Sequence, residues 1–255
     1  LADGRQIDAD AVVFNGDANA LATGLLGDDA RAATRALPRQ QRSLSALTWA
    51  VHAQSSGFAL SRHNVFFDDN YRAEFDDVFR HRRLPRRGTV YVCAQDRVDD
   101  SPAPAGRERL LCLVNAPPDG DDRPFDASET DPCFQQCLSL MQRCGLSLDT
   151  APQRTVVTSP ADFHRLFPGT GGALYGAASH GWMALFKRAG SSSRLPGLFL
   201  AGGSVHPGPG VPMAALSGQR AAETVMAHLA STSRSRRGAI SGGTSTRSAT
   251  TAGTA

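Results

Sequence analysis

A glycine-rich turn between an apolar run and a helix is the part of this sequence best suited to chemistry. The run at residues 198–201 has the pattern of a buried strand and ends at Gly202 and Gly203. An alanine-rich helix is expected to begin near Pro212. A strand, a glycine turn and a helix N-terminus bring backbone N–H groups close to an anion or a carbonyl, because glycine has no Cβ and accepts positive φ. The spacing alone is equally compatible with a plain connection in an α/β protein.

Two histidines are candidates for chemistry. His206 lies within the turn, where it can act as a catalytic base because histidine titrates near neutrality, or as a turn residue that hydrogen-bonds the backbone. His63 lies in an aromatic-rich extended segment with Phe66 and Phe67. These three residues can line a substrate channel, and His63 can equally be an ordinary core or edge histidine. We find no H-E-x-x-H or other metal-ligand spacing, so the sequence predicts no metal site.

The turn belongs to a longer segment that matches a known family. Residues 201–218 read Ala-Gly-Gly-Ser-Val-His-Pro-Gly-Pro-Gly-Val-Pro-Met-Ala-Ala-Leu-Ser-Gly. This segment resembles the C-terminal FAD-binding motif of bacterial carotenoid desaturases of the phytoene-desaturase type, within the amine-oxidase superfamily. It is most similar to the 1-hydroxycarotenoid 3,4-desaturases, also called methoxyneurosporene dehydrogenases. Further blocks similar to the family lie at 1–17, 61–67, 89–93 and 168–176, so the resemblance covers residues 1 to about 230.

The resemblance implies FAD as cofactor and places part of the chain against it. In the family, the C-terminal helix points its N-terminus at the flavin, where the helix dipole stabilises negative charge on the reduced ring. The matching residues are Gly202, Gly203, Ser204, Gly210, Val211, Pro212 and Met213, with Pro212 expected at the first helical position. Many flavoproteins carry an acidic residue where this chain has Gly203-Ser204, so the resemblance does not carry over a carboxylate contact to the ribityl chain.

The nucleotide-binding turn that opens this family, G-x-G-x-x-G, is absent from the sequence, and the glycines at 169–172 have a different spacing. We therefore expect a C-terminal fragment of a longer FAD-dependent desaturase, inactive alone, or a natural split subunit that needs an N-terminal partner. The implied reaction is dehydrogenation of a C–C bond in a hydroxylated or methoxylated acyclic carotenoid, with hydride transfer to flavin. The alternative is another flavin oxidoreductase of the superfamily, acting on retinoids or amines.

The order of expected strands and helices around these residues, together with the family resemblance, predicts an α/β fold with an α+β substrate region. The two ends, 1–17 and 196–230, are expected to form an incomplete Rossmann-like FAD domain, and 18–195 an inserted substrate domain with a mixed sheet. Expected strands lie at 7–14, 45–51, 57–67, 89–93, 110–114, 154–158 and 198–201. Expected helices lie at 18–36, 71–82 and 132–144 (capped by Asp131), after Ser159, and from Pro212.

Composition narrows the class of protein. The chain has 255 residues, of which 41% are hydrophobic, which is enough for a folded core. The net charge of +3 is concentrated in residues 231–255, a Ser/Thr/Gly/Arg tail that we expect to be disordered. The nearly neutral body argues against nucleic-acid binding.

An odd count of five cysteines without C-x-x-C indicates a reducing cytoplasm, and Cys133, Cys137 and Cys144 are expected to lie buried along one helix face.

No apolar run approaches the ~20 residues that span a bilayer. A carotenoid is nearly insoluble in water, however, so the implied substrate predicts peripheral contact with the inner membrane from the cytoplasm. Trp182 and Phe186 are spaced as on one helix face, beside Lys187 and Arg188. This segment is either a core-facing helix or a membrane-surface element at a channel mouth, where Trp182 would meet substrate.

Overall fold

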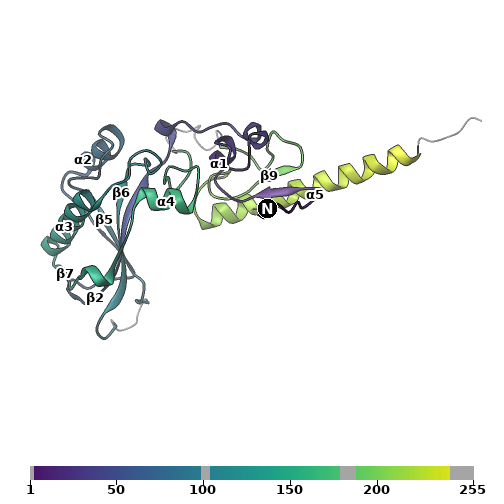
Figure 1. Ribbon diagram of the computed structural model, residues 1–255. Coiled ribbons are helices and arrows are strands. Elements are labelled where there is room, and N and C mark those ends of the chain that lie inside the picture. The colour runs from purple at the N-terminus through teal and green to yellow at the C-terminus, as the bar shows by residue number, and fades with distance from the viewer. Residues whose placement is uncertain (1–2, 99–103, 179–187, 242–255) are drawn as a thin grey trace, which may run out of the picture.

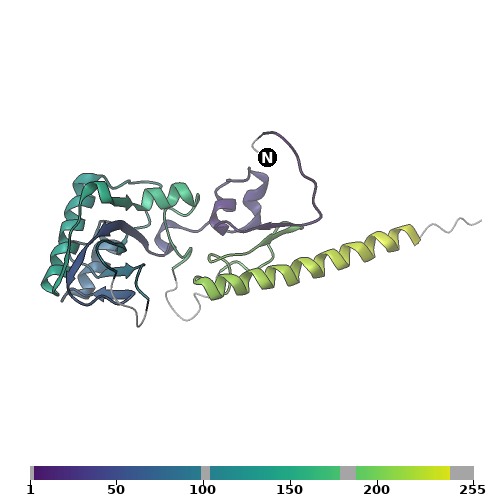
Figure 2. The same cartoon turned by 90° about the horizontal axis from the view of Figure 1, so that it is seen from below.

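The computed structural model describes residues 3–98, 104–178 and 188–241, and the side chains up to 232. A lobe built on an antiparallel sheet lies at one end, and a smaller lobe with the two ends of the predicted FAD domain lies beside it (Figures 1 and 2). The long helix α5 (Val211–Ser241) projects away from both.

The large sheet has five strands, and buried and more exposed residues alternate along three of them. Its order is β4 (His63–Phe66), β5 (Val90–Ala94), β6 (Glu108–Ala116), β2 (Ser45–Ala53) and β8 (Thr155–Thr158). Every neighbouring pair is antiparallel, so the expectation of a mixed sheet is wrong. A helix between two strands permits parallel pairing but does not impose it: β4 and β5 are joined through α2 (Tyr71–Phe75) and still pair antiparallel. A second antiparallel pair joins β3 (Ser55–Gly57) to β7 (Leu146–Leu148).

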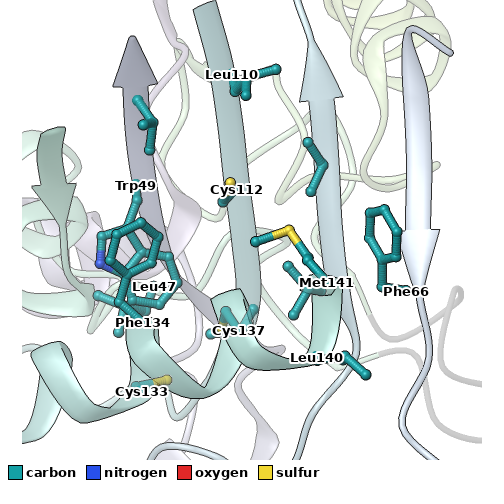
Figure 3. Packing of buried hydrophobic residues seen from close by; sticks show 14 of the residues in the cluster. Leu47, Trp49, Phe66, Leu110, Cys112, Cys133, Phe134, Cys137, Leu140 and Met141 are labelled. Atoms are coloured by element: carbon teal, nitrogen blue, oxygen red, sulfur yellow. The ribbon is translucent and has the colours of Figure 1, made fainter. Parts of the chain in front are cut away.

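One face of this sheet packs against α3 (Ala127–Arg143), forming the main core (Figure 3). Trp49 stacks on Phe134 with ring centroids 4.8 Å apart. The helix starts earlier than expected: Asp126 caps it by accepting from Ser128 N, and Pro132 lies inside it. Gly145, at φ +90°, follows its end as predicted.

The five cysteines are all free. Cys133 and Cys137 are buried in the main core, beside Cys112 of β6. Burial raises the pKa of the Cys112 thiol to about 12, so this thiol stays protonated. Cys144 is exposed, and its expected burial is wrong because it lies at the C-cap of α3, beyond the face that meets the sheet.

The smaller lobe joins the beginning and the end of the chain. β1 (Val12–Phe14) pairs in parallel with β9 (Leu198–Leu200). This pairing brings together segments 1–17 and 196–230, which the sequence predicts to lie in one domain. α1 (Ala18–Ala22) follows β1 and packs Leu21 against Leu200 and Val205. The expected helix over 18–36 is wrong, because Gly24 and Gly27 adopt positive φ and end it early.

The remaining helices are short. They are α2 (Tyr71–Phe75), continued by a π-helical turn at Asp76–Arg80, α4 (Pro160–Leu166), and 3-10 turns at Asp29–Ala33, Arg39–Gln41 and Pro152–Arg154. α4 begins with the predicted Ser159 cap, and Asp162 completes a capping box.

The helix α5 continues past residue 231, where the disordered tail was expected to begin. It continues to Ser241, so disorder from residue 231 is wrong for 231–241, while 242–255 lie outside the described residues. An established helix extends readily through residues such as Ala, Ser and Arg, because each added residue gains a hydrogen bond after nucleation. Among the described helices, none has the length and apolar character needed to cross a membrane.

Candidate functional site

The glycine-rich turn is held between the two helices of the smaller lobe. Ser204 Oγ accepts a hydrogen bond of 3.0 Å from Ala18 N at the start of α1. Gly202 N donates to Ser217 Oγ of α5 at 3.1 Å. The N–H of Ala201 donates to the Phe14 carbonyl at 3.1 Å, which extends the register of β1 and β9 into the turn. The turn is therefore a fixed element, and residues from both ends of the chain build it.

The two glycines of the turn differ in what they require. Gly202 has φ +119°, and a Cβ at this position would lie 2.9 Å from Asn15 Oδ1. At Gly203 φ is not positive, and the nearest atom to an added Cβ is Pro209 Cα at 3.8 Å. The turn conformation therefore requires glycine at 202, whereas 203 tolerates a small side chain unless a ligand approaches it.

The start of α5 presents free donors. Ala214 N is the first to bond within the helix, to the Gly210 carbonyl at 2.9 Å. The preceding N–H groups of Val211 and Met213 lack this partner. Val211 is 85% exposed and Met213 40% exposed. Pro212 is the second helical residue, not the first as expected, and costs no hydrogen bond there either.

A flavin fits these features. The accessible donors lie at the positive end of the helix dipole, beside Gly210, whose φ is +99° and around which an added Cβ would find open space. Backbone atoms here can thus be approached without obstruction by a side chain. These are the positions at which the family resemblance expects the cofactor.

Arg188 clamps the turn onto the segment before it. Its side chain is buried and donates to the carbonyls of Tyr175 (2.9 Å), Ala177 (2.6 Å) and Gly203 (3.3 Å). Of the two alternatives for this segment, the one that makes Arg188 a lipid-facing cation is therefore wrong, because these carbonyls draw the guanidinium into the protein. Trp182, Phe186 and Lys187, the other members of that predicted surface, lie outside the described residues.

An acidic residue does lie beside the turn, but it comes from the other end of the chain. Asp17 follows β1, caps α1 by accepting from Asn19 N at 2.8 Å, and lines a cavity of about 320 Å³ with Ser204 and Arg188. Burial raises the pKa of Asp17, and the positive charge of Arg188 opposes this shift. Sequence reasoning missed this carboxyl because it looked for an acid only at 203–204. Its position at the end of a strand was the available signal.

The remaining candidates are spread over both lobes. His206 is half-buried, and its backbone N–H donates to the Ala189 carbonyl at 2.8 Å, so its role as a base stays a prediction. His63 is exposed, with Nδ1 2.7 Å from Tyr91 Oη. Phe66 is 4% exposed and part of the main core, and its role as a substrate contact stays a prediction (Figure 3). Its neighbour Phe67 is 63% exposed.

A search for metal sites among the described residues finds no cluster of three His, Cys, Asp or Glu side chains. The candidate cofactor site is therefore the turn with the start of α5, on the evidence of its glycines and its helix N-terminus.

A parallel strand pair leading through a glycine turn to an open helix N-terminus, beside an antiparallel sheet lobe, is compatible with the fold of flavin-dependent amine oxidases. The family model for flavin-containing amine oxidoreductases matches residues 1–226, and the chain belongs to this family. Membership implies a flavin cofactor.

Particular relatives narrow the comparison. The chain is 69% identical to a hydroxyneurosporene desaturase from Rubrivivax gelatinosus over 255 residues, which cover all of this chain and 49% of that protein. It is 44% identical over 234 residues to the enzyme of the same name from Cereibacter sphaeroides, covering 92% of this chain and 46% of the relative. A 1-hydroxycarotenoid 3,4-desaturase from a Flavobacterium species is 34% identical over 221 residues, covering 86% and 44%. The chain spans about half the length of these relatives.

Proposed function

We propose that this chain is the C-terminal part of an FAD-dependent carotenoid desaturase that acts on a hydroxylated or methoxylated acyclic carotenoid. The observation that carries the proposal is 69% identity, over the whole chain, to a hydroxyneurosporene desaturase. The assembled glycine turn and the open start of α5 agree with it.

The residues of the turn would hold the cofactor through their backbone. Gly202, Gly203 and Ser204 would approach the ribityl and pyrophosphate groups, and the start of α5 would face the pyrimidine end of the flavin ring. FAD, when bound, supplies the acceptor for the hydride that leaves the substrate. The dipole of α5 stabilises negative charge at its N-terminus by about 0.3–1 kcal/mol, or more when the site is dry.

The protein's other tasks are orientation, exclusion of water and removal of a proton. An extended polyene delocalises developing positive charge, so correct placement of the reacting bond supplies much of the catalysis. His206 is our candidate to accept the proton at a ring nitrogen. Arg188 acts as a positioning residue, because it holds the Gly203 carbonyl and thereby the turn.

The proposed substrate also determines where in the cell we expect the enzyme to act. A lipophilic carotenoid must be collected from a bilayer, so we place the enzyme at the cytoplasmic face of the inner membrane in peripheral contact with lipid. If the enzyme is split, a second chain with the nucleotide-binding turn is its partner.

The direct test uses the flavin-loaded enzyme that contains this chain. It should desaturate a 1-hydroxylated acyclic carotenoid, with bleaching of the flavin absorbance and a product of longer conjugation by chromatography. A retinoid and a primary amine serve as comparison substrates. Efficient flavin reduction by either of these, without turnover of the carotenoid, would refute the proposal in favour of another member of the family.

A further inference from the structure

Four aromatic side chains form a continuous row on the outer side of α2 and its flanking residues. Phe67, Tyr71, Phe75 and Phe79 follow one another at intervals of four residues, and we refer to them as the aromatic stripe. Successive ring centroids lie 6.2, 5.0 and 6.3 Å apart. Rings at these distances are in contact, so the stripe is one connected apolar surface.

The outer half of the stripe is exposed and its inner half, Phe75 and Phe79, is half-buried, although the helix that carries it is anchored. A different side of the helix holds Glu74, which is fully buried and accepts from Thr89 N (2.9 Å) and Asn115 Nδ2 (2.6 Å). Phe67 is 63% and Tyr71 54% exposed. Polar bonds on the inner side therefore fix the orientation of the helix. Phe67 and Tyr71 leave neighbouring rings exposed, and exposed aromatic rings side by side typically mark a binding surface.

The inner end of the stripe enters an apolar groove of about 280 Å³. Phe75 and Phe79 line it together with Leu44, Tyr175, Ala178 and Pro209. Pro209 belongs to the glycine-rich segment that precedes α5, so the groove connects the stripe to the proposed cofactor site. The hydroxyl of Ser43, which also lines the groove, already accepts from Tyr175 N at 3.0 Å.

The chemistry of this lining selects one kind of occupant. Few polar groups face the groove, so a peptide or sugar would lose hydrogen bonds to water without replacing them. A long, flat conjugated hydrocarbon loses none, and its π-system stacks on aromatic rings. We infer that the aromatic stripe and the groove form the track along which the polyene of the substrate lies. This inference rests on the proposed function and assigns substrate contacts within it.

The experiment measures substrate affinity in the flavin-loaded enzyme. Phe75→Ala and Phe79→Ala each remove one ring, and Ala178→Phe fills the groove without removing any contact. A hydroxylated acyclic carotenoid is supplied in detergent micelles, and single-turnover bleaching of the flavin separates the dissociation constant from the reduction rate. Phe167→Ala is the matched control, because Phe167 is 61% exposed, follows the end of α4 and does not line the groove.

Each of the three groove variants should raise the dissociation constant roughly tenfold, with normal flavin content, while the control stays unchanged. Unchanged affinity in all three would overturn the inference. The measurement is repeated with the carotenoid delivered from liposomes. The inference is also overturned if the variants lose affinity only in that form, since the stripe then binds lipid. Loss of flavin in the ring variants, with Ala178→Phe normal, would show that Phe75 and Phe79 support the cofactor site and not the substrate, and would also overturn the inference. Failure of the unmodified enzyme to be reduced by any carotenoid would instead refute the proposed function.

Discussion

Replacing Arg188 tests whether one buried guanidinium holds the cofactor-binding turn in place. In the structure it bonds three carbonyls, those of Tyr175, Ala177 and Gly203, and lies close enough to Asp17 to influence its pKa. Arg188→Ala removes all of these bonds together. It leaves the Asp17 carboxylate without its nearby positive charge.

The magnitude follows from the bonds lost. A hydrogen bond to a charged donor contributes about 1.5–3 kcal/mol, but the bond to Gly203 is long at 3.3 Å, and such losses are not additive. The neighbouring cavity of about 320 Å³ can admit water to the freed carbonyls, which reduces the cost. We expect the free energy of unfolding to fall by about 3 kcal/mol. Arg188→Lys should lose less, because an ammonium keeps the charge but cannot reach all three carbonyls in one plane.

Urea unfolding, followed by circular dichroism, measures the stability, and flavin absorbance measures occupancy in the same preparations. Arg107→Ala is the control: this arginine pairs with Asp149 at the surface and should cost no more than about 1 kcal/mol. The expected order of loss is Arg188→Ala, then Arg188→Lys, then the control, with flavin occupancy falling in the same order. A loss below 1 kcal/mol for Arg188→Ala, with normal flavin content, would refute the clamp.

Three further changes probe the turn, the carboxyl beside it and the anchor of the stripe. Gly202→Ala should lose much of its flavin because of the φ of +119° and the close Asn15 side chain, while Gly203→Ala should fold normally; equal thermal stability of the two would contradict this. Asp17→Asn keeps the cap and should be at least as stable as wild type at neutral pH. Burial raises the pKa of the Asp17 carboxyl, so the stabilising contribution of this group is complete below the ordinary carboxyl range and is lost as pH rises through the raised pKa. Any stability advantage of Asp17→Asn should therefore vanish below about pH 4. Glu74→Gln should lower the free energy of unfolding by roughly 1–3 kcal/mol, since Thr89 N and Asn115 Nδ2 bond different carboxylate oxygens and the glutamine NH2 would face one of these donors; an unchanged urea midpoint would show that Glu74 is not the anchor.

Sequence patterns predicted the strands better than the helices. The alternation at 45–51 and the β-rich runs at 89–93 and 110–114 correspond to β2, β5 and β6, because one side of each strand is buried against α3. α3 begins before the predicted cap at Asp131, because Asp126 caps it and Pro132 is accommodated inside the helix. Alanine and leucine at 18–36 favoured a helix, and the glycines that interrupt it decided otherwise.

The candidate site was predictable only where its residues are contiguous. The glycine turn and the start of α5 follow one another in the chain, so their approach could be read from local pattern. Arg188 and Asp17 reach the turn from separate segments, and their contribution depends on which carbonyls and charges the fold brings near them. The local spacing of residues in the sequence does not predict these contacts.

The pairing of β1 with β9 has a consequence for how the protein is made. The bond from Ala18 N to Ser204 Oγ joins residues 186 positions apart, whereas the strands of the large sheet all lie between these two segments in the chain. Contacts between distant positions form late, because closing a long loop costs entropy before any contact is gained. During synthesis the sheet lobe can therefore fold while β9 is still within the ribosome. The glycine turn is completed last, so acquisition of flavin reports that folding has finished.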